Sequence, residues 1–153
     1  MDFQKFIDNY KQDDLNKIKF SWNGEYADKF EDKNVDFRYK LSEYIIPNIE
    51  NVNLALLVDL YVEHSRYAEK AWCVYNKYQV FANEILTRGK TKYLLEYLDA
   101  SRMCFDTFLA SQVAIDENIK IQFSQYLKEL KRQETDKHIL KIIDFGLDRF
   151  DKK

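Results

Sequence analysis

Turn-forming residues are scarce in this sequence. Its 153 residues include only three glycines and one proline, whereas average proteins contain about 7% Gly and 5% Pro. Sandwiches, barrels and doubly wound sheets need many more turn residues than this. The longest aliphatic run, Leu54 to Val58, is much shorter than the roughly 20 apolar residues of a membrane span. We therefore expect an all-α protein, folded as a single compact multi-helix domain over residues 1–153.

Motifs that carry chemistry are equally few. The cysteines Cys73 and Cys104 lack CxxC spacing, so we expect two buried free thiols rather than a disulfide or a zinc site. The glycines stand singly, which excludes the glycine-rich loops that cradle phosphates. The two histidines belong to no metal-binding motif of the H-E-x-x-H type. The sequence therefore predicts no cofactor and no metal ion.

The N-terminal residues do not resemble a targeting segment. No basic stretch followed by an apolar stretch opens the chain, which is the pattern of a secretory signal. We therefore expect a cytoplasmic protein without a membrane partner.

Helical periodicity runs through most of the chain and predicts seven to nine helices. A helix is expected from Val35 to Ile46, ended by the proline that follows. From Asn53, a suitable N-cap, apolar residues recur at helical spacing as far as Gly89, either as one long helix or as two joined near residues 65–68. Residues 68–88 are apolar on two sides, which predicts that they form the central helix.

Three further helices are predicted in the last third of the chain. The first covers residues 91–111 and is capped by Thr91, the second starts after Asp116, and the third starts after Thr135. Gly146 is expected to end or fray the third helix, since glycine is a poor helix former.

One segment of the sequence recurs. Residues 61–67 and 97–103, which start 36 positions apart, share a tyrosine, an aliphatic residue, an acid and a Ser-Arg pair in the same order. A period of this length is typical of stacked helical pairs, which form a concave face suited to protein binding. The alternatives are chance and a packing solution that the two helices share.

Acidic residues are concentrated in the first part of the chain. The net charge is −2, which gives no attraction to nucleic acid. Residues 1–64, however, carry 13 acidic and 8 basic side chains. This distribution indicates either an ordinary solvated helix surface or an acidic docking face for a basic partner.

Aromatic residues are concentrated in the same region. Ten of the 24 lie in the first 50 residues, and Tyr and Trp are enriched at protein interfaces. A composition bias from an AT-rich genome is the alternative explanation. We therefore distinguish an aromatic-rich, acidic helical part at 1–50 from the main helical bundle at 53–150. The residues expected to bind a partner are Asp13, Asp14, Trp22, Glu25, Tyr26, Asp28, Glu31, Asp32 and Asp36.

These features favour a protein-binding module over an enzyme. An acidic face can cover the basic active site of a nuclease and accelerate association with it. We therefore expect an immunity protein or inhibitor that neutralises a bacterial toxin by covering it with this face. An interaction or regulatory module of another kind is a further alternative.

One motif supports an alternative function. The segment Arg132-Gln133-Glu134-Thr135-Asp136-Lys137-His138 resembles the Arg-to-His motif of HEPN-type ribonucleases, which are all-helical proteins of similar length. The resemblance implies a dimeric ribonuclease in which Arg132 holds phosphate and His138 performs acid–base chemistry at the ribose 2′-hydroxyl. Gln133 departs from that family, which often has Asn after the Arg.

Overall fold

The computed structural model describes residues 2–151, which form an all-α domain, as predicted. Within these residues, the only β-type pairing is an isolated bridge between Trp22 and Asp32. No helix in the described range is long and apolar enough to cross a membrane. The α-helices are α1 (Phe3–Asp8), α2 (Val35–Ile45), α3 (Leu54–Ala71), α4 (Tyr78–Gly89), α5 (Leu94–Ser101), α6 (Phe105–Ala110), α7 (Glu117–Gln133) and α8 (Lys137–Phe150), and the 3-10 helices are η1 (Gln12–Lys17), η2 (Ala27–Lys29) and η3 (Ile46–Asn51).

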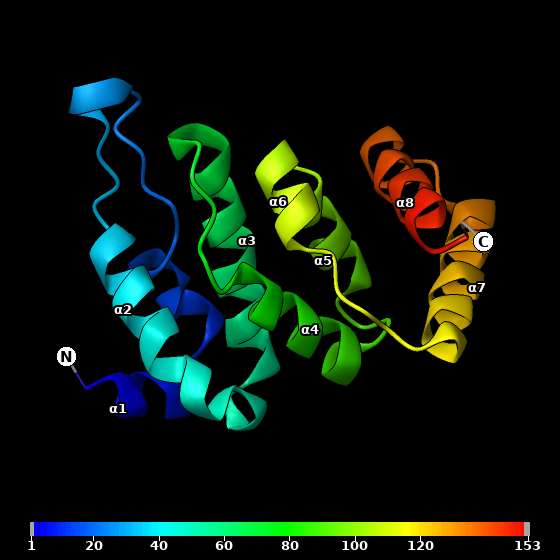
Figure 1. Ribbon diagram of the computed structural model, residues 1–153, viewed down its shortest axis with the longest axis horizontal. Helices are drawn as coiled ribbons and strands as arrows, with labels where there is room; N and C mark the ends of the chain where they lie inside the picture. The colour runs from blue at the N-terminus through cyan, green and yellow to red at the C-terminus, as the bar shows by residue number, and fades with distance from the viewer. Residues whose placement is uncertain (1, 152–153) are drawn as a thin grey trace.

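The helices lie in a row across the molecule (Figure 1). The α5 helix packs against both α3 and α8, while α4 packs against α3 and α5. Successive helices pair, α3 with α4, α5 with α6, and α7 with α8. The N-terminal segment and α2 lie beside α3 at the opposite end from α7, so the two chain ends are far apart (Figure 1).

The recurring sequence segments lie within α3 and at the end of α5, where residues 102 and 103 follow the helix. In each, a serine hydroxyl donates to the backbone carbonyl of the tyrosine four residues earlier, Ser65 to Tyr61 at 2.9 Å and Ser101 to Tyr97 at 2.6 Å. The two tyrosine rings stack with centroids 5.8 Å apart, and the Tyr61 hydroxyl lies 2.8 Å from the Ser101 hydroxyl. The shared residues thus form a hydrogen-bonded contact between two core helices, which satisfies the buried hydroxyl groups.

The predicted central helix over residues 68–88 is wrong. The helix stops at Trp72, which adopts the left-handed conformation with φ 54°, and the next helix starts only at Tyr78. The connection is held by Tyr75, whose ring stacks on His64 at 4.5 Å and whose hydroxyl donates to Glu43 at 2.5 Å. These tertiary contacts outweigh the helical periodicity, which continues through the break.

Other helix boundaries differ from the prediction in smaller ways. The expected helix over 91–111 is divided into α5 and α6, and it begins after Tyr93 rather than at Thr91. Asp116 caps α7 as predicted, since its carboxylate accepts from the N–H of Asn118. The cap of α8 is Asp136, rather than the preceding threonine, because its carboxylate accepts two backbone N–H groups of the first turn.

Gly146 lies inside α8, so the prediction that it ends or frays this helix is wrong. A Cβ at this position would stand 2.5 Å from Cδ1 of Leu98 and 2.7 Å from Cδ1 of Leu127. The missing side chain therefore allows α8 to pack closely against both α5 and α7.

The cysteines are less buried than predicted. Cys73 is exposed and Cys104 is half-buried, and both are free thiols. The prediction failed because it placed both residues inside helices, whereas Cys73 lies in the connection between α3 and α4, and Cys104 lies in the connection between α5 and α6.

Candidate functional site

A loop formed by residues 20–32, here called the hairpin loop, projects from the helical body. It rises beyond the N-terminal end of α2 and carries η2 at its tip (Figure 1). The bridge between Trp22 and Asp32 closes its base, and the backbone N–H of Asn23 donates to the carbonyl of Glu31 at 3.0 Å. The loop brings together six of the nine predicted partner-binding residues, namely Trp22, Glu25, Tyr26, Asp28, Glu31 and Asp32.

Hydrogen bonds within the loop fix its conformation. The Asn23 side chain donates to the carbonyl of Lys29 at 2.6 Å, and its oxygen accepts from the N–H groups of Glu25 and Glu31. The Trp22 indole N–H donates to the carbonyl of Glu25 at 2.7 Å. At the tip, Ala27 adopts a φ of 56°, a left-handed conformation that persists in a non-glycine residue only where its surroundings enforce it. The loop is therefore ordered before any partner binds.

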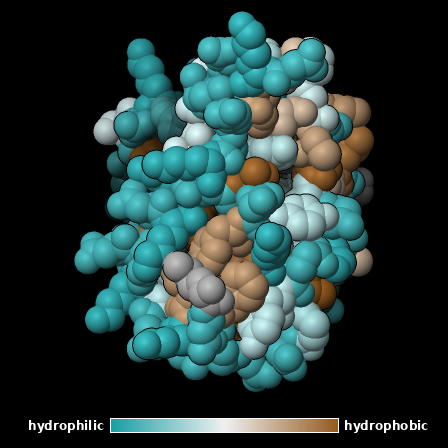
Figure 2. Space-filling model, turned by 90° about the vertical axis from the view of Figure 1, so that its left-hand side faces the viewer, coloured by the Kyte–Doolittle hydropathy of each residue, from teal (hydrophilic) through white to brown (hydrophobic). Residues whose placement is uncertain are grey.

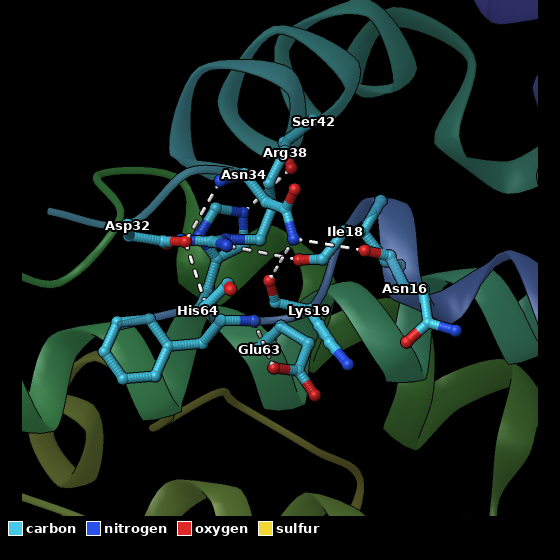
Figure 3. Close-up of polar contacts among 11 residues, drawn as sticks. Asn16, Ile18, Lys19, Asp32, Asn34, Arg38, Ser42, Glu63 and His64 are labelled. Carbon is cyan, nitrogen blue, oxygen red and sulfur yellow. Dashed lines mark hydrogen bonds and ion pairs between the residues drawn. The ribbon is translucent and has the colours of Figure 1, made fainter. Parts of the chain in front are cut away.

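A buried ion pair anchors the second half of the loop, where the chain returns to the helical body (Figure 3). Nη2 of Arg38 lies 2.7 Å from Oδ2 of Asp32, and neither side chain is exposed. The other carboxylate oxygen accepts from the N–H groups of Ser21 at 2.9 Å and Asn34 at 3.1 Å. Nη1 of Arg38 donates to the carbonyl of Ile18 at 3.1 Å. Asp32 therefore holds the loop in place, and the prediction that it belongs to the exposed docking face is wrong.

A second buried carboxylate, that of Glu63 on α3, anchors the first residues of the loop. It accepts from the backbone N–H of Phe20 at 2.7 Å and pairs with Nη1 of Arg66, also at 2.7 Å. Burial raises the pKa of Glu63, and the hydrogen bond from Phe20 and the charge of Arg66 act in the opposite direction. Both ends of the loop are thus fixed to the helical body by carboxylates (Figure 3).

His64 lies beneath this network and is neutral. Its Nε2 atom is 2.8 Å from the Ser42 hydroxyl, and its ring stacks on Tyr75. Burial, with a smaller contribution from the charge of Arg38, lowers the pKa of His64 to about 3. The imidazole therefore supports the fold rather than transferring protons near neutral pH.

The outer surface of the loop combines carboxylates with aromatic rings. Tyr26 is 57% exposed and contacts the half-buried Trp22 edge to face at 4.9 Å. Lys70 of α3 covers the Trp22 ring at 5.6 Å. Figure 2, which faces the side formed by α2 and the loop, shows a largely hydrophilic surface with a few hydrophobic patches. The exposed carboxylates of the loop belong to Glu25, Asp28 and Glu31.

The other predicted acidic residues lie outside the loop. Asp13 and Asp14 belong to η1, where Asp14 pairs with Lys17 at 2.8 Å, and this contact holds the pKa of Asp14 below its usual range. Asp36 is exposed in the first turn of α2, directly after the loop. The predicted acidic residues thus come from three separate elements rather than from one continuous helix face.

The two residues of the ribonuclease motif lie on different helices and share no hydrogen bond in the described part of the chain. Arg132 is exposed at the end of α7 and His138 is exposed in the first turn of α8. Nδ1 of His138 lies 3.4 Å from Nη2 of Arg102, and its Nε2 lies 3.5 Å from Oδ1 of Asp99. Within residues 2–151, no hydrogen bond connects Arg132 with His138. The ribonuclease alternative stays a prediction.

A cleft that the sequence analysis did not identify adjoins the base of the hairpin loop. Its volume is about 540 Å³, and α3, α5 and the start of α8 supply most of its walls. The recurring segment was the only sequence signal for it, because each copy contributes an arginine. The lining residues are Phe20, Arg66, Glu69, Lys70, Asp99, Arg102, Met103 and His138. In the part of the chain that the structure describes, no three His, Cys, Asp or Glu side chains are grouped for a metal ion.

Known proteins provide no family for this chain. No protein-family model matches it, and no curated protein and no solved structure is significantly similar to it. Its function is therefore inferred from the geometry of the hairpin loop and the cleft.

Proposed function

We propose that the protein is a protein-binding module, an immunity protein or inhibitor that neutralises a bacterial toxin. The hairpin loop would cover a basic surface of the toxin, such as the active site of a nuclease. The main support for this proposal is the combination of a projecting, internally braced loop with exposed carboxylates and an exposed tyrosine at its tip.

Rigidity makes such a loop an effective binding element. Ordering a flexible loop on binding costs roughly 0.5–1.5 kcal/mol for each side chain that is immobilised. Here Asn23 and the buried Asp32–Arg38 pair already hold the backbone in one conformation. The backbone of the loop therefore needs no further ordering on binding, and only its exposed side chains lose conformational freedom.

The exposed side chains of the loop suit a partner rich in lysine and arginine. Glu25, Asp28 and Glu31 can attract a basic surface and increase the association rate. The exposed ring of Tyr26 offers a face for an arginine guanidinium as well as apolar area. Tyrosines of this kind commonly contribute a large share of the energy at protein interfaces.

Charge reversal on the loop tests the proposal. The partner would be captured from the source cells with the tagged protein, and its association and dissociation rates measured by surface plasmon resonance. The triple variant Glu25→Lys, Asp28→Lys and Glu31→Lys is expected to weaken binding by at least about tenfold, mainly through the association rate, with a smaller difference at high salt.

The matched control reverses three exposed carboxylates elsewhere, with Glu50→Lys, Glu96→Lys and Glu129→Lys. This control has the same net charge as the loop variant, so it separates a local contact from bulk electrostatics. Equal affinity losses in the two triple variants, or unchanged binding by the loop variant, would contradict docking through the hairpin loop.

A further inference from the structure

Two arginines from the recurring segments meet in the cleft. Arg66 on α3 and Arg102, which directly follows the last residue of α5, occupy the same position of the segment, and both line the cleft. A carboxylate three residues earlier in the chain orients each of them. Oε1 of Glu63 lies 2.7 Å from Nη1 of Arg66, and Oδ1 of Asp99 lies 3.0 Å from Nη2 of Arg102. The repeated sequence therefore places two braced guanidinium groups at one site.

Both guanidinium groups keep donors for a further anion. Arg66 uses Nη1 for its carboxylate, and Arg102 uses Nε and Nη2. Within residues 2–151, Nη2 of Arg66 and Nη1 of Arg102 make no hydrogen bond. A guanidinium group has five N–H donors in a planar fork, which matches the oxygens of a phosphate group.

Two further basic side chains complete the lining. Lys70 comes from the last turn of α3, and His138 comes from the first turn of α8. Each cation has a carboxylate beside it, because Glu63 pairs with Arg66, Asp99 pairs with Arg102, and Glu69 lies 3.7 Å from the Lys70 ammonium group. An anion would therefore be recognised here by the unused arginine N–H groups rather than by an excess of positive charge.

We propose that this cleft binds a small phosphate-bearing molecule, whose phosphate oxygens are held by Arg66 and Arg102 with Lys70 and His138 at their sides. Donors from α3 and from the residue after α5 match a group with several oxygens better than they match a single carboxylate. Phe20 and Met103 provide an apolar wall for the organic part of the ligand. The volume of about 540 Å³ lies within the usual range of small-molecule sites. The site is distinct from the exposed tip of the hairpin loop and does not depend on the proposed protein partner.

Nuclear magnetic resonance tests the site in the unmodified protein, because the chain contains only two histidines. His138 lines the cleft, whereas His64 is buried beneath the hairpin loop and serves as an internal reference. Titration with pyrophosphate, and separately with ADP, is expected to move the ring C–H resonances of His138 saturably while those of His64 stay in place. A dissociation constant at or below about 1 mM in 0.15 M NaCl is expected for at least ADP.

Variants locate the binding groups. Arg66→Gln and Arg102→Gln are each expected to weaken binding by roughly tenfold. Arg132→Gln, which removes an exposed arginine at the end of α7, is expected to leave binding unchanged within about twofold. Arg66 also contacts the buried Glu63, so circular dichroism should confirm that its variant is folded. If it is not, Lys70→Gln provides the same test at a partly exposed side chain.

Three results would overturn the proposal. The first is the absence of a saturable His138 shift with either ligand up to about 10 mM, beyond the range of a specific site. The second is equal weakening by Arg132→Gln and by the cleft variants, which would indicate nonspecific attraction to the surface. The third is binding of a single-stranded RNA oligonucleotide without binding of pyrophosphate or ADP, which would indicate a polyanion surface instead.

Discussion

Arg38 and Asp32 form an ion pair that is enclosed entirely by protein, with Nη2 and Oδ2 separated by 2.7 Å. The guanidinium also lies 5.4 Å from the centre of the Tyr67 ring. This pair links the end of the hairpin loop to the first turns of α2, so the conformation of an exposed loop depends on a buried charge. Removing one partner of a buried pair leaves the other charge without compensation, which is far more costly than losing a surface pair.

We therefore expect Asp32→Asn to lower the free energy of unfolding by about 3–5 kcal/mol. The amide also cannot reproduce the carboxylate that accepts from Ser21, Asn34 and Arg38. Urea denaturation followed by circular dichroism at pH 7 measures the effect. Asp28→Asn is the matched control, since Asp28 is exposed in the same loop, and its effect should stay within about 0.5 kcal/mol. Similar stabilities for the two variants would refute the anchoring role of Asp32.

Gly146→Ala is expected to destabilise the protein by about 1–3 kcal/mol, because the added methyl group meets Leu98 and Leu127 at distances below 3 Å. The sign is informative, since the same substitution at an exposed helical position would stabilise the helix by roughly 1 kcal/mol. Thermal denaturation of the variant is compared with that of Lys141→Ala, at an exposed position of the same helix. A raised melting temperature for Gly146→Ala would show that α8 does not pack closely at this point.

Helix caps and local periodicity could be predicted from the sequence because the signals lie within a few residues of each other. Asn53 and Asp116 cap α3 and α7 as predicted, and the helix expected at Val35–Ile46 is observed as Val35–Ile45. The break after α3 could not be predicted in this way. Its cause is the contact of Tyr75 with Glu43, a residue 32 positions earlier in the chain, and no glycine or proline marks it.

For the candidate sites as well, features that depend on neighbouring residues could be predicted from the sequence, whereas features that depend on distant residues could not. The composition of residues 1–50 indicated an acidic and aromatic surface, and the structure places six of the nine residues predicted to bind a partner on one projecting loop. The composition could not show that Asp32 is buried in an ion pair with Arg38, because burial depends on how α2 packs. The cleft draws on α3, α5 and α8, and a single sequence gives no measure of the distance between residues on different helices.

The exposed thiol of Cys73 should react with Ellman's reagent well before Cys104. Cys73 lies in the open connection between α3 and α4, whereas Cys104 is half-buried and its sulfur contacts the Thr107 hydroxyl at 3.5 Å. We expect a fast phase and a slower phase of equal amplitude, since access of the reagent limits the reaction of the less exposed thiol. Cys73→Ser should remove the fast phase and Cys104→Ser should retain it. The reverse assignment would show that the connection is closed in solution.

The stability of the protein should depend on pH through His64. Burial lowers the pKa of His64 to about 3 in the folded state, whereas an unfolded histidine has a pKa of about 6.5. Between these values the unfolded chain binds a proton that the folded protein does not bind. The contribution of His64 is therefore fully present above pH 6.5 and is lost as the pH falls towards 3, by up to about 1.4 kcal/mol per pH unit.

The raised pKa values of the buried carboxyls of Asp59 and Glu63 act with the opposite sign, so the slope for the wild type alone does not isolate His64. The difference between the wild type and His64→Gln does, because both proteins retain these carboxyls and glutamine does not titrate. Urea denaturation at pH 7, 6 and 5 should show the stability of the wild type approaching that of the variant as the pH falls. Gln125→Ala should run parallel to the wild type, since this exposed substitution removes no titratable group. Parallel curves for His64→Gln as well would mean that the imidazole is open to protonation in the folded state, and that the hairpin loop does not seal the network beneath it.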